Sequence, residues 1–242
     1  MEFCNFQTLF CCSLEKNGLP IPDLAVQERF HAFTEHLLKV NQTTNLTAIR
    51  EIPDFIDKHL VDSLTVASYV PQNACILDLG CGPGFPSIPL AIVRPDLKIT
   101  ALDSTAKKIA FVQGAIDCLS LSNLTAIAGR AEDRALSVKI GKFDVVTGRA
   151  VARLNVFCEL CLPYVKIGGK FIAMKGAKGE EELTEAQNAV KVLGGGEIAT
   201  HRLSLILASG GIEQRSIIEI EKNKATPAGY PRAYAAILKK PL

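Results

Sequence analysis

Two hydrophobic periods alternate along most of this chain. Short apolar runs of a few residues predict strands, and longer stretches with apolar residues three or four positions apart predict helices. From residue 75 to residue 193 the two kinds of segment follow one another in turn. This order predicts an α/β fold with a doubly wound, mostly parallel sheet and helices on both faces.

The individual elements can be placed from these runs. We expect strands at 75–79, 98–102, 124–128, 143–147 and 170–174. We expect helices at 88–93, 107–119, 151–162 and 180–193. Two further strand-like segments follow, at 198–207 and 216–220, and we expect them to pair as an antiparallel edge of the sheet.

The first 70 residues have a purely helical pattern. Asp23 follows a proline and predicts a helix start. A polar break occupies residues 41–45, and a second helix is predicted over residues 54–69. We therefore divide the chain into an N-terminal helical extension, residues 1–70, and a sheet domain, residues 71–242.

The composition is typical of a globular protein with a large core. Of the 242 residues, 48% are hydrophobic, and the formal net charge is only +2. Binding to nucleic acid would therefore depend on local basic patches. No apolar run is long enough to cross a membrane, and the N-terminus has no secretory pattern. We expect a cytoplasmic monomer that does not contact a membrane.

The eight cysteines and four histidines do not form a metal-binding pattern. In a reducing compartment we expect the cysteines to be free thiols. Cys158 and Cys161 form a CxxC motif, but they fall in the middle of a predicted helix, whereas a redox CxxC opens one. We interpret these two cysteines as core residues and expect no bound metal.

The strongest chemical signal follows the first predicted strand directly. Residues 78–86 read DLGCGPGFP, which places Gly80, Gly82 and Gly84 two residues apart, just after Asp78. Glycines here let the backbone turn sharply and approach a ligand, and open α/β sheets bind ligands at the carboxyl ends of their strands. A dinucleotide fold uses the longer G-x-G-x-x-G spacing. A tight turn without a ligand is the simpler alternative.

Two further signals follow the next two strands. Asp103 ends the second strand, where a carboxylate accepts hydrogen bonds from two ribose hydroxyls. The alternative is a helix cap, because Ser104 and Thr105 continue as a helix start. Ala131 and Glu132 follow the third strand, where the backbone can contact the base of a nucleotide.

These motifs together resemble those of the ribosomal RNA small subunit methyltransferase G family. The matching segments are NLT at 45–47 with Arg50, HLVDS at 59–63, DLGCGPGFP at 78–86, IPLA at 88–91, VRP at 93–95, LDS at 102–104, GRA at 148–150 and MKG at 174–176. The chain departs from the family at Val40 and Thr44, where aromatic residues are usual. The family's basic C-terminal signature is kept only in part.

The resemblance implies a class I methyltransferase fold, S-adenosylmethionine as the cofactor, and methylation of N7 of a guanine in small-subunit (16S) ribosomal RNA. The partner would be this RNA or its assembly particle. The resemblance also implies cofactor contacts at Gly80, Phe85, Asp103, Ala131, Glu132 and Arg149. Asp78, Gly82 and Ser104 lie in the same motifs and complete the predicted cofactor site.

The substrate side has fewer candidates. Asn45 has an amide that both donates and accepts, so we predict that it orients the base; a helix cap is an equal alternative. Lys175 ends the fifth strand, and we predict that it contacts RNA phosphates, with a solvated surface lysine as the alternative. For Arg149, the alternative to a cofactor contact is a structural ion pair. Residues 232–240 would supply a basic tail for RNA.

Other functions remain open at this point. The same sheet could serve a methyltransferase acting on another RNA site, or a non-catalytic RNA-binding assembly protein. A nicotinamide-dependent dehydrogenase is disfavoured by the spacing of the glycines.

Overall fold

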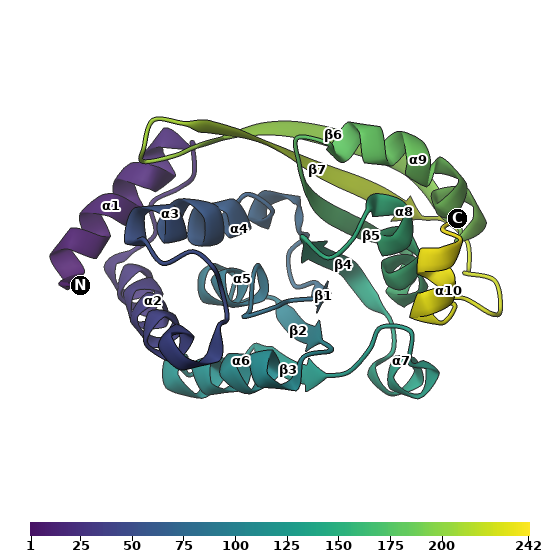
Figure 1. The fold of residues 1–242 in the computed structure, drawn as a ribbon, viewed down its shortest axis with the longest axis horizontal. Coiled ribbons are helices and arrows are strands. Elements are labelled where there is room, and N and C mark those ends of the chain that lie inside the picture. The colour runs from purple at the N-terminus through teal and green to yellow at the C-terminus, as the bar shows by residue number, and fades with distance from the viewer.

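Seven strands form one mixed sheet in the computed structural model, which describes residues 1–242 (Figure 1). The strand order is β3-β2-β1-β4-β5-β7-β6. The strands are β1 (Cys75–Leu79), β2 (Lys98–Asp103), β3 (Leu124–Ala128), β4 (Phe143–Arg149), β5 (Val165–Gly176), β6 (Gly195–Ile206) and β7 (Ile212–Lys222). The first five run parallel, and β7 pairs antiparallel with β5 and β6. The predicted fold class and the antiparallel edge are confirmed.

The helices lie on both faces of this sheet. They are α1 (Phe3–Lys16), α2 (Leu24–Thr44), α5 (Ser87–Val93), α6 (Ala106–Leu119), α7 (Arg134–Ile140), α8 (Leu154–Cys161), α9 (Gly179–Val192) and α10 (Tyr234–Lys239). The helix predicted at 54–69 consists of α3 (Ile52–Phe55), a π-helical segment (Ile56–Val61) and α4 (Asp62–Leu64), with a short 3₁₀ turn (Ala67–Tyr69) after it. Helices α7 and α10 were not predicted from the sequence.

Successive residues of the central strands bury opposite faces of the sheet. On β1, Ile76 packs into the core formed with α1, α2, α5 and α6, whereas Leu77 packs into the core formed with α8, α9 and α10. Val145 and Val146 on β4 divide in the same way. Strands buried on both faces read as continuous apolar runs, which is why the sequence predicted them well.

The N-terminal helices share a core with the sheet domain. Phe10 of α1 and Phe33 of α2 belong to the same buried cluster as Ile88 of α5 and Val112 of α6. Asp23 caps α2, as predicted, by accepting a hydrogen bond from the Val26 amide at 2.9 Å. The segment 1–70 therefore completes one face of the sheet.

Polar contacts tie the same helices to the β6–β7 hairpin, which reaches across the molecule to α1 (Figure 1). The buried Asp57 carboxylate accepts hydrogen bonds from the Ser13 hydroxyl at 2.5 Å and from the Ala208 amide at 2.6 Å. Asn17 exchanges two hydrogen bonds with the backbone of Ile206, at 2.8 and 3.0 Å. These contacts hold the tip of the hairpin against α1.

The C-terminal segment folds back against α8 and is not a free basic tail. Glu159 of α8 has a fully buried side chain, and its carboxylate accepts hydrogen bonds from the backbone and guanidinium of Arg232 at 2.5 to 3.0 Å. Ile237 of α10 is also fully buried. Of the cations predicted to contact RNA here, Lys239 and Lys240 are exposed, whereas Arg232 holds the segment in place.

All eight cysteines are free thiols. Cys158 and Cys161 lie in α8 and are buried, as predicted for core residues, and burial raises the pKa of both thiols. No helix is both long and apolar enough to span a bilayer.

The Arg232–Glu159 contact generates a stability prediction. Arg232→Met leaves the Glu159 charge buried without its partner, which should lower the free energy of unfolding by about 3 kcal/mol in urea titrations. Lys239→Met removes an exposed cation from the same segment and should change it by less than about 0.5 kcal/mol. Equal effects of the two variants would contradict the anchoring role of Arg232.

Candidate functional site

A cleft of about 560 Å³ opens where the first four parallel strands end. Its walls come from the loops after β1 to β4 and from the segment between α2 and α3. Eight of the predicted site residues line it: Gly80, Gly82, Phe85, Asp103, Ser104, Ala131, Glu132 and Arg149. The structure thus brings together most of the predicted cofactor residues from four separate loops.

The glycine loop is shaped by its contact with the end of β2. The Gly80 and Cys81 amides donate to the Leu102 carbonyl at 2.7 and 3.1 Å, and the Gly82 amide donates to Asp103 Oδ2 at 2.9 Å. Gly80 and Gly82 have φ values of +76° and +56°, which side-chain-bearing residues rarely adopt. No atom lies within 4 Å of the position that a Cβ on Gly82 would take. The loop therefore presents bare backbone to the cleft.

Asp103 fastens this loop and faces the cleft at the same time. Its Oδ1 accepts from the Thr105 amide at 2.8 Å, alongside the bond to Gly82. Asp103 is not the helix cap considered as the alternative, because Thr105 is the N-cap residue of α6 and no side chain caps that helix. The residue is 9% exposed. Each carboxylate oxygen keeps a second acceptor position, because an ionised carboxylate offers about four in all. The geometry leaves acceptor positions available for two hydroxyl groups.

Asp78 lies beneath the loop and does not line the cleft. Its side chain is fully buried; Oδ2 accepts from the Ser87 amide at 3.0 Å, and Oδ1 has no partner. Burial raises the pKa of Asp78 to about 7. Asp78 therefore stabilises the first turn of α5 by binding the Ser87 amide.

The loop after β3, which lines the cleft at Ala131, is held in place by a buried tyrosine. The Tyr164 hydroxyl donates to the Ala131 carbonyl at 2.7 Å, and burial raises the pKa of Tyr164 to about 12. Glu132 next to it contacts the exposed Arg130 at 3.4 Å. The backbone at Ala131 is thus fixed from the core side, and its neighbours face the cleft.

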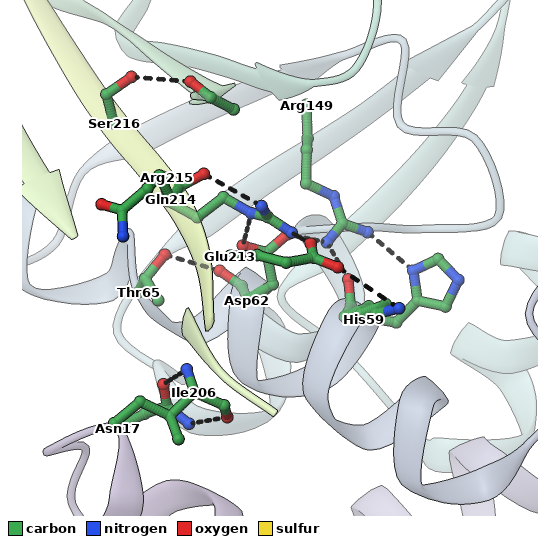
Figure 2. Close-up of polar contacts among 12 residues, drawn as sticks. Asn17, His59, Asp62, Thr65, Arg149, Ile206, Glu213, Gln214, Arg215 and Ser216 are labelled. Carbon is green, nitrogen blue, oxygen red and sulfur yellow. Dashed lines mark hydrogen bonds and ion pairs between the residues drawn. The ribbon is translucent and has the colours of Figure 1, made fainter. Parts of the chain in front are cut away.

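Arg149 at the end of β4 belongs to a partly buried charge network (Figure 2). One guanidinium nitrogen donates to Asp62 Oδ2 at 2.6 Å and to the Lys58 carbonyl at 2.7 Å. The other oxygen of Asp62 accepts from Arg215 of β7 at 2.9 Å, and Arg215 also binds Glu213 at 2.7 Å. The structural ion pair considered for Arg149 is present, and the residue lines the cleft as well.

His59 links Arg149 to the segment between α2 and α3. Its Nδ1 lies 3.0 Å from a guanidinium nitrogen of Arg149, and its Nε2 lies 2.8 Å from Thr47 Oγ1. The His59 ring stacks on Phe85 with centroids 4.5 Å apart and planes 7° apart. Burial, followed by the charge of Arg149, lowers the pKa of His59 to about 3. The imidazole is therefore neutral at physiological pH.

The two residues predicted for the substrate side do not line the cleft. Asn45 is exposed and ends α2 in the left-handed conformation, with φ 51°, so the alternative cap position is the one observed. The Lys175 amine points inward: it contacts Glu182 at 2.6 Å and the Ala152 carbonyl at 2.8 Å, and its side chain is 9% exposed. The geometry does not favour the RNA contact predicted for Lys175.

Comparison with known proteins assigns the chain. The family model described as rRNA small subunit methyltransferase G matches residues 26–206. The chain belongs to this family. A protein named Ribosomal RNA small subunit methyltransferase G from Brevibacillus brevis is 43% identical over 232 residues, 95% of this chain and 96% of that protein. The protein of the same name from Geobacillus thermodenitrificans is 41% identical over 247 residues and covers both chains fully.

Solved structures share the fold at low sequence identity. An O-methyltransferase from Bacillus cereus, crystallised in complex with SAH, superposes with a TM-score of 0.57 at 18% identity, covering 91% of this chain and all of that chain. The methyltransferase fold of this family member is therefore established.

Sequence reasoning missed His59, Asp62 and Thr47 as site residues. All three lie in the family segments NLT and HLVDS, so the signal was present. His59 lies in the π-helical segment and Asp62 directly follows it; π-helical turns are rare and concentrated at functional sites. No group of three or more His, Cys, Asp or Glu side chains is arranged to hold a metal ion.

The lowered pKa of His59 predicts a pH dependence of stability. The unfolded chain protonates this histidine near pH 6.5 but the folded chain does so only near pH 3, so stability falls as the pH drops below about 6.5. His59→Phe keeps a stacking ring and removes the titration. Between about pH 6.5 and about pH 5, wild type should lose about 1.5 kcal/mol more than this variant in urea titrations.

The matched control for this measurement is His36→Gln, because His36 lies on α2 and stacks on Phe111, away from Arg149. A control that flattens the pH profile as much as His59→Phe does would contradict the assignment to His59.

Proposed function

We propose that this protein transfers a methyl group from S-adenosylmethionine to N7 of a guanine in small-subunit ribosomal RNA. The observation that carries the proposal is the glycine loop held by Asp103 at the mouth of the cleft, in a chain of the rRNA small subunit methyltransferase G family. The substrate is this RNA or its assembly particle. We further propose that it acts as a monomer in the cytoplasm.

The residues of the cleft fit S-adenosylmethionine. The volume of about 560 Å³ is in the range of small-molecule sites. Asp103 offers acceptors for ribose hydroxyls, and the bare backbone at Gly82 allows close approach. Three of the five N–H groups of Arg149 bind Lys58, Asp62 and His59, so two remain for a carboxylate.

The proposed reaction needs no general base. Bound S-adenosylmethionine supplies an activated methyl group, and N7 of guanine accepts it with a lone pair it already has. The chain's residues therefore act by positioning, which contributes up to about 7–11 kcal/mol when the reacting atoms are well aligned. Phe85 packs against the rings of His59 and Phe55, which also contact each other, and offers a rigid apolar wall for this purpose.

The RNA must approach across a positive surface, since phosphate contacts dominate affinity for RNA. Lys108 lines the cleft, and Arg50 is exposed on the segment between α2 and α3; neither forms an ion pair. Lys175 is left out of this surface because its amine binds Glu182. We propose that RNA reaches the cleft beside Lys108 and Arg50.

The function is tested by incubating the protein with methyl-labelled S-adenosylmethionine and small-subunit ribosomal RNA, either free or in the assembled subunit. Mass spectrometry of nuclease fragments then maps the modified nucleotide. One 7-methylguanosine in one of the two substrates is the expected result. Label at another atom, or in neither substrate, would overturn the proposal.

Asp103 provides the sharpest test of the cofactor site. Asp103→Ala removes the ribose acceptors and releases the Gly82 amide, so the Kd for S-adenosylmethionine should rise more than about tenfold in calorimetry. Asp117→Ala removes an exposed carboxylate from α6 and should leave the Kd unchanged. A normal Kd in Asp103→Ala would place the cofactor elsewhere.

A further inference from the structure

Thr47 is held at the wall of the cleft by a buried amide. Asn41 is 7% exposed, and its Oδ1 accepts from the Leu46 and Thr47 amides at 2.6 and 3.0 Å. Its Nδ2 donates to the Thr47 carbonyl at 2.9 Å. Both backbone polar groups of Thr47 are therefore bound to one side chain of α2, which fixes where this residue faces the cleft.

The hydrogen bonds around Thr47 decide the direction of its hydroxyl. Arg149 only donates, so His59 Nδ1, 3.0 Å from its guanidinium, must be the acceptor. A neutral imidazole then carries its hydrogen on Nε2, and this N–H donates to Thr47 Oγ1 at 2.8 Å. The Ile49 amide donates to the same oxygen at 3.2 Å.

These two bonds use both acceptor positions of the Thr47 hydroxyl. A hydroxyl has two acceptor lone pairs and one hydrogen, and no other group accepts that hydrogen within the protein. The chain from Asp62 through Arg149 and His59 therefore leaves Thr47 as an obligatory donor at the wall of the cleft.

We propose that the Thr47 hydroxyl donates to O6 of the target guanine and selects guanine against adenine. The proposal rests on the proposed function, because it deepens the recognition of the same substrate. Beside N7, guanine presents the acceptor O6, whereas adenine presents the N6 amino donor. A hydroxyl that can only donate binds the first and opposes the second.

The guanine is favoured over the cofactor as the partner of Thr47 for two reasons. Arg149 keeps two N–H groups for a carboxylate of the cofactor, so that group has a charged partner already. Thr47 lies on the segment between α2 and α3, outside the loops after β1 to β4 that hold the residues suited to a nucleoside.

The experiment uses the full-length protein and RNA fragments spanning the mapped nucleotide, with guanosine, inosine or 2-aminopurine riboside at that position. All three bases have N7, and only 2-aminopurine lacks O6. Wild type should methylate the inosine fragment and discriminate against 2-aminopurine. Thr47→Val should lower kcat/KM for guanosine at least about tenfold and leave kcat/KM for 2-aminopurine unchanged, so the discrimination collapses.

Three comparisons keep the outcome decisive. Thr47→Ser retains the hydroxyl and should retain the discrimination, while Thr43→Val, an exposed threonine near the end of α2, is the matched control. Equal loss on guanosine and 2-aminopurine, or a raised Kd for S-adenosylmethionine in Thr47→Val, would overturn the proposal. The fragments are used free or assembled into the small subunit, whichever form the mapping identifies as the substrate. Failure of wild type to methylate the guanosine fragment in that form would instead overturn the proposed function.

Discussion

The carboxylate of Asp62 is the constraint on which the candidate site depends. Its side chain is 5% exposed and binds two guanidinium groups, Arg149 of β4 and Arg215 of β7. A buried charge is stable only when it is paired, so α4, which begins at Asp62, must pack beside β4 and β7 in the folded chain. The position of Arg149 then sets the tautomer of His59, and His59 in turn sets the hydrogen bonding of Thr47.

The sheet and the glycine loop were predictable from local sequence. Strands buried on both faces require continuous apolar runs, and β1 was predicted to the residue. The bounds of the edge strand β3 were also predicted to the residue, although only Leu124 of it is buried. The loop at Gly80 and Gly82 was predictable because its positive φ values demand glycine. The role of the Asp103 carboxylate was predictable because this residue ends β2, next to that loop.

The pairing of charged side chains was not predictable, because the partners lie far apart in the chain. Asp62 and Arg149 are 87 positions apart, and Glu159 and Arg232 are 73 apart. From the sequence, Arg232 and Lys175 were predicted to contact RNA. In the structure each side chain forms an ion pair with a carboxylate of the protein itself. Helices α7 and α10 were missed because α7 buries no residue and α10 buries only Ile237, so neither shows a periodic apolar face.

The shared core of the N-terminal helices has a consequence for the evolution of this enzyme family. Helix α2 packs against α5 and α6, α1 packs against α2 and the π-helical segment, and Asp57 binds the hairpin tip. The N-terminal segment that lines the cleft therefore cannot be exchanged as a separate module. A lineage that acquired a new RNA target would have to alter single side chains within this wall. Recombination at residue 70 would instead join residues 1–70 to a sheet domain whose contacting side chains do not fit them.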